Sequence, residues 1–483
     1  MVSLLERATL AVGVSMSIPD DHVHDECGVI GVFSRSDDVA RVAFFGLYAL
    51  QHRGQESAGI ATSDGESIKV RTAMGLVTQT FQEEDLERLT GHMAIGHTRY
   101  STTGSSHARN AQPLVSKGPD VELALGHNGN VVNAQALRDE LVGWGCSFST
   151  SSDSEIVAHL ITNAPATTWE DRVAYAMRRI EGAYSLALMT TEFLMAIRDP
   201  LGVRPLCLGK LNGGWVIASE TCALDHIGAD FIREIEPGEA VVIDDEGPRS
   251  IYRWQGEQRR ASCVFEHIYF ARPDSLLDGR LVYTNRMAMG AELAREHPVE
   301  ADMVIGVPDS ATAAAVGYSQ ESGIPYGEGL VKNRYVGRTF IAPDQRLRDL
   351  GVRTKYNPLP EIIGGKRLVV VDDSIVRATT TPYVVSLLWQ GGAKEVHLRI
   401  GAPPIKFPCH LGIDMGTRRE LIAANMTVEE IRRVLKADSL GYLSLEGLVR
   451  AVGLDKSRLC MACFTGDHPI PVQLEMDKLA LEI

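Results

Sequence analysis

The first cysteine of the chain, Cys27, lies in the stretch HDECGVIGV (residues 24–32), between an acidic segment and an alternating apolar run. A cysteine attacks carbon as the thiolate, so a nucleophilic cysteine needs a base or a positive field close by. Cleavage of the chain before Cys27 would supply a base on the same residue, because a free α-amino group has a pKa of about 7.7–8.0. On this stretch alone, a buried structural cysteine remains the alternative.

Polar segments downstream contain the other groups that amide cleavage needs. Arg99 in GHTRYSTTG offers two donors to a carboxylate, and Asp153 in SDSE offers a counter-charge to an ammonium group. In GHNGNVVN, Asn128 and Gly129 can direct a side-chain amide and a backbone N–H at a developing oxyanion. Taken singly, each has a structural alternative: a surface charge for Arg99, a helix N-cap for Asp153 and a hairpin turn for Asn128 and Gly129.

Together, these segments resemble the N-terminal-nucleophile glutaminase domain of the glutamine amidotransferases, over residues 27 to about 240. The resemblance implies that residues 1–26 are removed and that Cys27 attacks the side-chain amide of glutamine. Ammonia and a glutamyl thioester result, and water releases glutamate. It also implies a glutamine-gripping pair, Arg99 with Asp153, and an oxyanion hole, Asn128 with Gly129.

A second constellation lies in RLVVVDDSIVRATTT, residues 367–381. An apolar strand ends in Asp372 and Asp373, and a hydroxyl-rich turn leads into a helix. Backbone N–H groups and hydroxyls at such a turn form a phosphate cradle, and the carboxylates can hold ribose hydroxyls or a hydrated Mg²⁺. An ordinary strand–Asp–helix junction is the alternative.

This string resembles the phosphoribosyl-pyrophosphate (PRPP) motif of type I phosphoribosyltransferases, except that Ala378 stands where glycine is usual. The added methyl narrows the backbone freedom of the turn. The resemblance implies a basic loop, VKNRYVGRTFI (331–341), that closes over PRPP, and one Mg²⁺ per subunit near VIGVPDSATAAA (304–315). The implied PRPP contacts are Asp372, Asp373, Ser374, Arg377, Ala378, Thr379, Thr380, Lys332 and Arg338, and the implied Mg²⁺ ligands are Ser310, Asp372 and Asp373.

Four of the eight cysteines lie in the second half: Cys263, Cys409, Cys460 and Cys463. The last two form a lone C-x-x-C pair, which is a weak signal by itself. Four thiolates could hold a zinc ion or a [4Fe–4S] cluster, and their spacing does not choose between them. Four unconnected thiols remain a further alternative.

With FEHIYFARPDS (265–275) between them, the two halves resemble the amidophosphoribosyltransferase family over residues 27 to about 470. The resemblance implies that ammonia passes internally to the anomeric carbon of PRPP and displaces pyrophosphate, giving 5-phosphoribosylamine, at the first committed step of purine biosynthesis. One branch of the family combines a cleaved leader with a four-cysteine [4Fe–4S] cluster, and the cysteines match its pattern. It further implies a cytoplasmic homotetramer that purine nucleotides inhibit.

The elements that must position these groups change character along the chain. Short strands with Gly and Asn at their ends dominate residues 27–255 and predict antiparallel sheets covered by helices, an αββα arrangement. Buried strand, polar loop and helix alternate over 256–470 and predict a parallel, doubly wound sheet. The expected domains are thus a leader (1–26), a glutaminase domain (27–255), a phosphoribosyltransferase domain (256–470) and a tail (471–483).

The composition excludes several other classes of protein. A formal net charge of −14 argues against a nucleic-acid binder, and the 45% hydrophobic residues include no run long enough for a membrane span.

The motifs argue against three further alternatives. A sugar-phosphate or asparagine synthase would lack the PRPP motif. A PRPP-sensing regulator would lose the catalytic residues, and a purely structural iron–sulfur protein would leave the first half unexplained.

Overall fold

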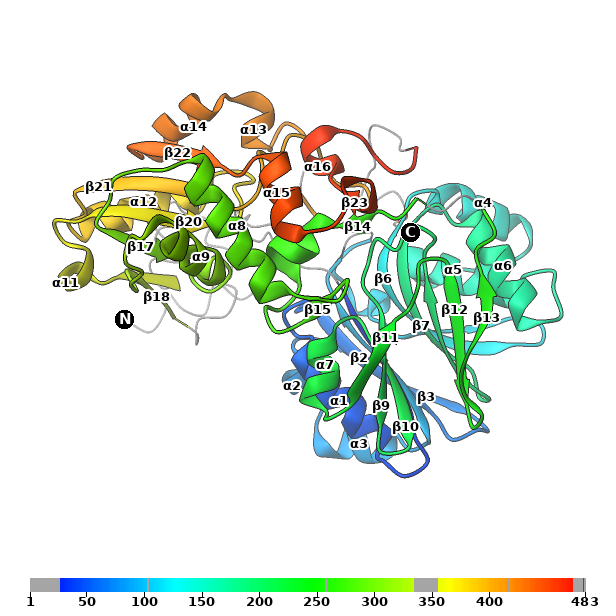
Figure 1. Ribbon diagram of the computed structural model, residues 1–483. Coiled ribbons are helices and arrows are strands. Elements are labelled where there is room, and N and C mark those ends of the chain that lie inside the picture. The colour runs from blue at the N-terminus through cyan, green and yellow to red at the C-terminus, as the bar shows by residue number, and fades with distance from the viewer. Residues whose placement is uncertain are drawn as a thin grey trace, which may run out of the picture.

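The computed structural model of the chain describes residues 27–101, 104–256, 259–333, 355–415, 417–471 and 481. The first half of the chain forms one lobe and most of the second half forms another (Figure 1). The leader expected over 1–26 and most of the tail expected over 471–483 lie outside the described residues. Among the helices of the described part, none is both long and apolar enough to cross a membrane.

Two antiparallel sheets build the first lobe. Side chains alternate between the faces of a strand, so Val29 of β1 packs between the two sheets while Ile30 packs on the outer face. A register shift of one residue would exchange these faces, and burial on both sides therefore fixes the pairing. The seven-stranded sheet has the order β11 (Asp230–Glu234), β9 (Cys207–Leu211), β10 (Gly214–Ala218), β1 (Gly28–Phe33), β4 (Met93–Arg99), β2 (Ser57–Ser63), β3 (Ile68–Met74). The six-stranded sheet has the order β13 (Gly247–Arg253), β12 (Glu239–Asp244), β8 (Leu194–Arg198), β7 (Gly182–Met189), β6 (Glu122–Val131), β5 (Leu114–Lys117).

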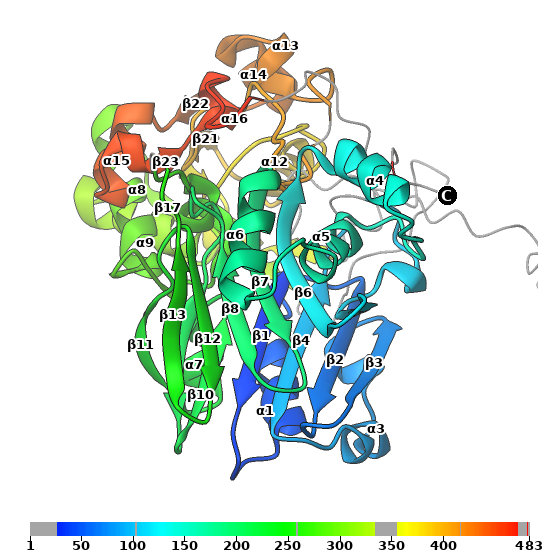
Figure 2. The same cartoon turned by 90° about the vertical axis from the view of Figure 1, so that its right-hand side faces the viewer.

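Helices cover the outer face of each sheet and complete four layers (Figure 2). Leu47 of α1 packs with Ile30 on the seven-stranded sheet, and Ile156 of α5 packs with Leu125 on the six-stranded sheet. The Asp38 side chain caps α1 by accepting from the backbone N–H of Arg41. The helices of this lobe are α1 (Val39–Ala49), α2 (Val77–Thr80), α3 (Glu83–Arg88), α4 (Ala134–Gly143), α5 (Asp153–Thr162), α6 (Trp169–Arg179) and α7 (Thr221–His226).

The second lobe contains a parallel sheet of β17 (Met303–Gly306), β20 (Arg367–Asp372), β21 (Glu395–Ile400) and β22 (Ser439–Tyr442). A parallel bridge joins Tyr326 to Val304 on the outer side of β17. Along the chain, the segment at Tyr326 lies between β17 and β20, so the spatial order reverses between these two strands. Such a reversal is the switch point of a doubly wound sheet, where ligands bind beyond the carboxyl ends of the strands.

Helices pack on both faces of this sheet. On β20, Val369 shares a core with α8 and α9, while Val370 shares the opposite core with α12. The helices are α8 (Val282–Glu296), α9 (Thr312–Ser322), α11 (Pro360–Ile363), α12 (Thr381–Gln390), α13 (Ile422–Asn425), α14 (Val428–Leu435) and α15 (Leu445–Val452). These two lobes confirm the predicted fold class: helix-covered antiparallel sheets in the first half and a parallel, doubly wound sheet in the second.

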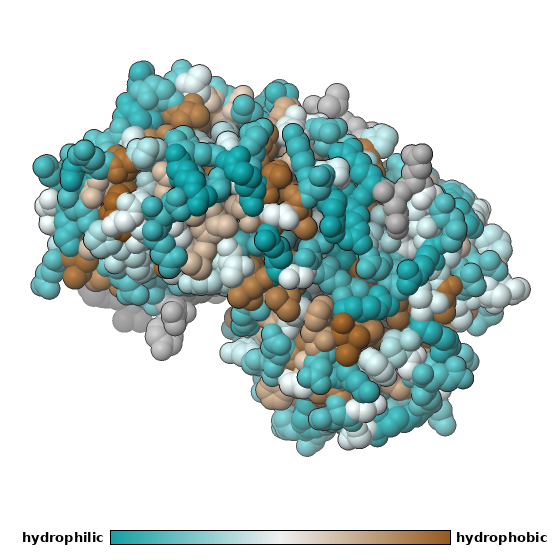
Figure 3. All heavy atoms as spheres, viewed as in Figure 1, coloured by the Kyte–Doolittle hydropathy of each residue, from teal (hydrophilic) through white to brown (hydrophobic). Residues whose placement is uncertain are grey.

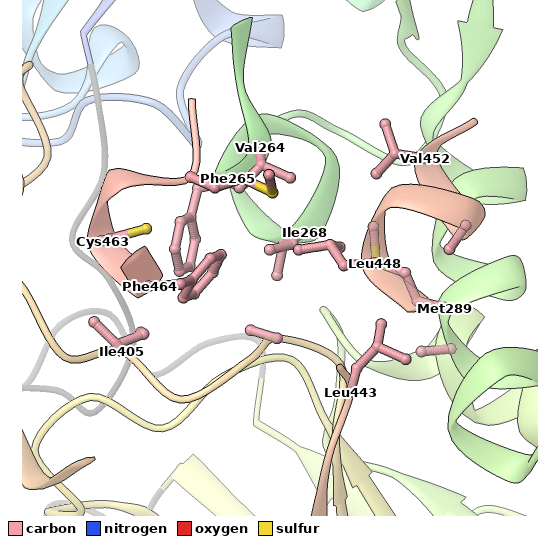
Figure 4. Packing of buried hydrophobic residues seen from close by; sticks show 14 of the residues in the cluster. Val264, Phe265, Ile268, Met289, Ile405, Leu443, Leu448, Val452, Cys463 and Phe464 are labelled. Carbon is pink, nitrogen blue, oxygen red and sulfur yellow. The ribbon is translucent and has the colours of Figure 1, made fainter. Parts of the chain in front are cut away.

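Segments distant in the chain meet between the lobes. β14 (Ser262–Cys263) pairs in parallel with β23 (Leu459–Cys460), and a π-helix (Glu266–Phe270) and α16 (Ala462–Thr465) follow them. The rings of Phe265 and Phe464 lie 5.6 Å apart at this junction (Figure 4). One apolar core continues from Val203 of the first lobe through Phe265 into the second lobe.

The outer surface contrasts with these cores. On the face shown in Figure 3, hydrophilic side chains cover most of the area, and apolar side chains form small, separate groups. The described residues also include three short two-stranded pairings besides the main sheets: β14 with β23, β15 (Leu276–Leu277) with β16 (Arg280–Leu281), and β18 (Leu330–Lys332) with β19 (Tyr356–Pro358).

Candidate active sites

Cys27 lies at the start of the central strand of the seven-stranded sheet. It directly precedes β1, and β1 pairs with β4 so that Gly28 is opposite Thr98. This register brings Cys27 beside Arg99, the last residue of β4. The Cys27 thiol is 6% exposed and donates to the carbonyl oxygen of Tyr100 at 3.3 Å. The predicted nucleophile and the predicted carboxylate-binding arginine are therefore neighbours.

Burial keeps the Cys27 thiol protonated. Burial raises the pKa of Cys27 to about 11; the hydrogen bond to Tyr100 and the charge of Arg99 lower it, while the charges of Glu56 and Asp153 raise it. A group with this pKa keeps its proton at neutral pH, so a base must remove it within the same buried site. The α-amino group that cleavage before Cys27 would free meets this requirement.

The predicted oxyanion hole lies within strand β6 and not in a hairpin turn. Asn128 is 1% exposed, and its Nδ2 has no hydrogen-bond partner among the described residues. Buried side-chain amides are normally paired, so an unsatisfied donor of this kind points to a missing ligand. Gly129 has a φ of +151°, and a Cβ there would lie 1.9 Å from the carbonyl oxygen of Ala183 on β7. Only glycine therefore fits beside Asn128.

The predicted glutamine-gripping pair is also buried. Arg99 is 2% exposed and donates to the carbonyl oxygen of Ser105 at 3.3 Å, so it is not a surface charge. Asp153 is the first residue of α5, but the N-cap is Ser152. The Oδ2 of Asp153 accepts instead from the backbone N–H of Val131 at 3.0 Å, which ties α5 to β6, the strand of Asn128 and Gly129. Both structural alternatives are thus wrong for these two residues.

One buried residue of this site escaped the sequence reasoning. Arg53, in QHRGQESAGIA, donates from Nε to the carbonyl oxygen of Cys27 at 3.0 Å. Its Nη2 donates to Oε1 of Glu266 at 2.7 Å, and its Nη1 donates to Oε1 of Glu220 at 2.5 Å. Burial by itself lowers the pKa of Arg53, but these two carboxylates outweigh it and raise the pKa. In the sequence, a basic residue between a helix-forming and a strand-forming run looks like an exposed turn.

The acidic pair of the second lobe lies at the switch point of the parallel sheet. Asp372 ends β20 and Asp373 follows it, and both are buried. The backbone N–H of Asp373 donates to Oδ1 of Asp372 at 2.9 Å, and Oγ of Ser374 donates to Oδ1 of Asp373 at 2.7 Å. These bonds orient the two carboxylates at the carboxyl edge, where a doubly wound sheet binds its ligands.

The predicted phosphate turn leads from Ser374 to the N-terminus of α12. Ala378 lies on this turn with a φ of +55°, in the left-handed region that an L-residue with a Cβ adopts at a cost. This conformation explains why glycine is usual at the position. Arg377 and Ala378 are half-buried and Thr379 is exposed, while Thr380 is buried at the helix start. The turn is therefore buried at Ser374 and Thr380 and reaches the surface at Thr379.

The remaining predicted PRPP residues divide between described and undescribed segments. Ser310 follows β17, next to the acidic pair's strand, and is half-buried. Lys332 ends β18, and its Nζ donates to Oδ2 of Asp309 at 3.1 Å, so the structure brings this lysine to the loop of Ser310. Arg338 lies outside the described residues.

The four cysteines of the second half meet between the lobes. Cys263 and Cys460 are opposite each other in the parallel pairing of β14 with β23, and Cys463 lies on α16 (Figure 4). Burial raises the pKa of the Cys463 thiol well above its ordinary value, and the charges of Cys460, Cys263 and Cys409 raise it further. All four sulfurs thus lie within electrostatic reach of one another.

This set of thiols does not form a close ligand shell for one metal ion. Among the described residues, no three His, Cys, Asp or Glu side chains lie close enough together to hold a single ion. Tetrahedral zinc with bonds of 2.3 Å would require sulfurs about 3.8 Å apart. A [4Fe–4S] cluster is also bound by four cysteine thiolates, but each thiolate binds a different iron, so the four sulfurs need not meet around one ion.

The chain is similar to known proteins over almost its full length. The family model described as "Glutamine amidotransferase domain" matches residues 97–226. Relatives named amidophosphoribosyltransferase include one from Synechocystis sp., 50% identical over 96% of this chain and 95% of its own length, and one from Archaeoglobus fulgidus, 50% identical over 92% of this chain and 98% of its own. A solved structure of a glutamine PRPP amidotransferase from B. subtilis, complexed with ADP and GMP, superposes with a TM-score of 0.88 at 45% identity, covering 93% of this chain and 99% of that one.

Proposed function

We propose that Cys27 carries out glutamine cleavage and that the turn after β20 binds PRPP for the second half-reaction. The chain belongs to the amidophosphoribosyltransferase family, whose members transfer the amide nitrogen of glutamine to PRPP at the first step of purine biosynthesis. The observation that supports this assignment most strongly is that two of the predicted groups lie close to one thiol and that one of them also bonds to the strand of the third. Arg99 and Asp153 both act electrostatically on Cys27, and Asp153 is bonded to the strand that contains Asn128.

In the first half-reaction, Sγ of Cys27 attacks the side-chain amide carbon of glutamine. After removal of residues 1–26, the α-amino group takes the thiol proton and passes it to the leaving nitrogen, which departs as ammonia. The Nδ2 of Asn128 and the backbone N–H of Gly129 stabilise the oxyanion. Arg99 pairs with the α-carboxylate of glutamine, and Asp153 pairs with its ammonium group. Water then hydrolyses the thioester and releases glutamate.

In the second half-reaction, ammonia forms a bond to the anomeric carbon of PRPP and the bond to pyrophosphate breaks. Asp372 and Asp373 meet the ribose hydroxyls, and the backbone and hydroxyl groups of Ser374 to Thr380 bind the 5-phosphate. Lys332, together with Arg338, offers positive charge to the leaving pyrophosphate. Transfer of ammonia inside the protein excludes water, which would otherwise compete for the same carbon.

Two cofactors belong to this proposal. Oxygen ligands from Ser310, Asp372 and Asp373 suit one Mg²⁺, a hard cation that usually binds through one or two carboxylates and the phosphates of its substrate. When bound, it would neutralise charge on pyrophosphate. The four gathered thiols suit one [4Fe–4S] cluster per subunit, which would join β14, β23 and α16 structurally. The cysteine ligands would be Cys263, Cys409, Cys460 and Cys463.

The assembly and its control complete the proposal. The B. subtilis relative was solved with ADP and GMP, which supports inhibition of this chain by purine nucleotides. A homotetramer and a cytoplasmic location follow from the family resemblance, and eight free cysteines suit a reducing compartment. We place the boundary between the glutaminase domain and the phosphoribosyltransferase domain near residue 255, just beyond β13, with a leader over 1–26 and a tail from 471.

A crossed substitution experiment tests the two halves. Cys27→Ala should abolish product formation from glutamine and leave formation from free ammonia, because only the first half-reaction uses the thiol. Asp373→Ala should impair both, because both need PRPP. Initial rates with each nitrogen donor measure the outcome. If Asp373→Ala spares the ammonia reaction, or Cys27→Ala still uses glutamine, the assignment is wrong.

A further inference from the structure

A short segment of the second half lies against the strand that contains the oxyanion hole. We name this segment, Cys409–Gly412, the strap. The Nδ2 of Asn130 on β6 donates to the carbonyl oxygen of His410 at 3.0 Å. The Nη2 of Arg204 donates to the carbonyl oxygen of Leu411 at 2.7 Å. Asn130 and Arg204 are both buried residues of the first lobe. Two hydrogen bonds between the lobes therefore fix the strap beside Gly129.

The close approach of the strap depends on a glycine at its end. Gly412 has a φ of +103°, and a Cβ there would lie 3.1 Å from the carbonyl carbon and 3.3 Å from the carbonyl oxygen of Gly129. The same Cβ would lie 3.1 Å from Nη2 of Arg204. A Cβ on Gly129 itself would lie 1.9 Å from the carbonyl oxygen of Ala183 on β7. The backbone of Gly129 therefore approaches both β7 and the strap closely.

The strap is also linked to the four cysteines of the second half (Cys263, Cys409, Cys460 and Cys463), which we name the cysteine centre, and to Arg53, which donates to Cys27. The backbone N–H of Leu411 donates to Sγ of Cys409 at 3.3 Å. Arg204, which binds the carbonyl of Leu411, lies 4.0 Å from Oε1 of Glu266. Glu266 in turn pairs with Arg53, the donor to the Cys27 carbonyl. One set of polar contacts therefore runs from a thiol of the cysteine centre to both parts of the glutaminase site.

We propose that the strap is a positioning element for the oxyanion hole, so that its contacts with the first lobe govern the use of glutamine and not the use of ammonia. This inference rests on the proposed roles of Asn128, Gly129 and Cys27. An oxyanion hole works only when its donors are held in place before the charge develops. Strands β6 and β7 hold the Gly129 peptide from one side, and the strap supplies the contact on the other.

The substitution Gly412→Ala tests the strap directly. Its methyl group must displace the Gly129 peptide by a few tenths of an ångström, and misplacement of about 1 Å can cost 10²-fold in rate. We expect about a 10-fold lower kcat with glutamine and an ammonia-dependent rate within about 2-fold of the unsubstituted protein. The matched control is Gly213→Ala, because Gly213 has a φ of +90° with nothing within 4 Å of its Cβ position. That variant should have the same backbone strain without the contact.

Hydrogen–deuterium exchange supplies a readout independent of activity. The peptide that contains Gly129 should exchange faster in Gly412→Ala than in Gly213→Ala, while the peptide that contains Asp373 should exchange equally in both. Iron content, measured on the same samples, should be equal in both variants. Asn130→Ala, which removes the bond to His410, should reproduce the selective loss of glutamine use and decides the matter if Gly412→Ala does not fold.

The outcomes separate this inference from the proposed function. If Gly412→Ala and Asn130→Ala use glutamine as well as Gly213→Ala does, the strap has no positioning role. If the rates with glutamine and with ammonia fall in parallel, the segment is merely structural and the inference is equally wrong. The proposed function fails separately, if Cys27→Ala retains the use of glutamine while Gly213→Ala is fully active.

Discussion

The two reactive centres differ in how completely the described chain encloses them. Cys27, Arg99, Asn128 and Asp153 are all buried where strands and helices of a four-layered lobe meet. At the PRPP centre, the acidic pair, Ser374 and the helix start are buried, while Thr379 is exposed on the turn between them. The first centre is therefore largely preformed, and its enclosed position suits a small substrate. The second combines buried groups with a turn that reaches the surface at Thr379, where a large, charged substrate can dock.

The largest expected effect concerns the enclosed centre. Asn128→Ala removes the buried donor that we propose stabilises the oxyanion, and should lower kcat with glutamine about 10²–10³-fold. Because the PRPP turn lies in the other lobe, the rate with ammonia should stay near that of the unsubstituted protein. Steady-state rates with both donors measure the contrast, and a matched fall in the ammonia rate would erase the distinction between the centres.

The next largest effect is expected from breaking the ion pairs of Arg53, the residue that donates to the carbonyl oxygen of Cys27. Arg53→Met removes the cation that bonds the buried carboxylates of Glu266 and Glu220, and loss of one partner of a buried ion pair costs about 3–5 kcal/mol of stability. Urea denaturation measures the change in the free energy of unfolding. Adding Glu266→Gln to Arg53→Met should restore part of it, because one unpaired charge is removed. A fully additive loss would mean that Arg53 and Glu266 do not interact.

Low pH should lower the stability of the first lobe, because buried His97 binds a proton only when the chain unfolds. Burial lowers the pKa of His97 from 6.5 to about 3, so the unfolded chain binds the proton in a range where the folded protein does not. Stability must then fall as the pH drops from about 6.5 toward 3. His97→Gln keeps a donor for the carbonyl of His127, which the ring contacts at 3.0 Å, without this titration. Urea midpoints at pH 7 and pH 5 should differ less in the variant, and an equal difference would contradict the assignment.

The smallest effect is expected on the open turn. Ala378→Gly relieves a left-handed conformation that costs an L-residue about 1–2 kcal/mol, but it also gives the unfolded chain more freedom. We expect a net change in stability below about 1 kcal/mol and a KM for PRPP that changes by less than about 5-fold. Glutaminase rates should not change at all. A large effect on glutamine cleavage would mean that the turn and the first centre are not separate.

The fold could be predicted from the sequence, and so could those site residues whose side-chain type and local motif indicate their chemistry. Alternating runs identified the antiparallel strands, and RLVVVDDS identified β20, because a strand buried on both faces is continuously apolar. Arg53, Glu266 and the strap were not predictable in this way. Each acts through contacts between residues far apart in the chain: Arg53 and Glu266 are 213 positions apart, and Asn130 and His410 are 280 apart. Local patterns contain no information about such pairs.

The cysteine centre is a second example of a site whose assembly local sequence patterns could not predict. Spacing left zinc, an iron–sulfur cluster and unconnected thiols open, because Cys263 and Cys409 are remote from the C-x-x-C pair in the sequence. The parallel pairing of β14 with β23 brings Cys263 opposite Cys460, which only the fold could show. The family resemblance chose the cluster, and iron and sulfide analysis of anaerobically purified protein would test that choice.

Intact mass spectrometry of protein that is active with glutamine tests the central claim most directly. The sample would be inactivated with a glutamine analogue that alkylates the nucleophile, such as 6-diazo-5-oxo-norleucine, and then weighed and mapped. We predict a chain that begins at Cys27 and carries one label on that residue. An active, labelled chain that still includes Glu26, or a label on any other residue, would contradict the account.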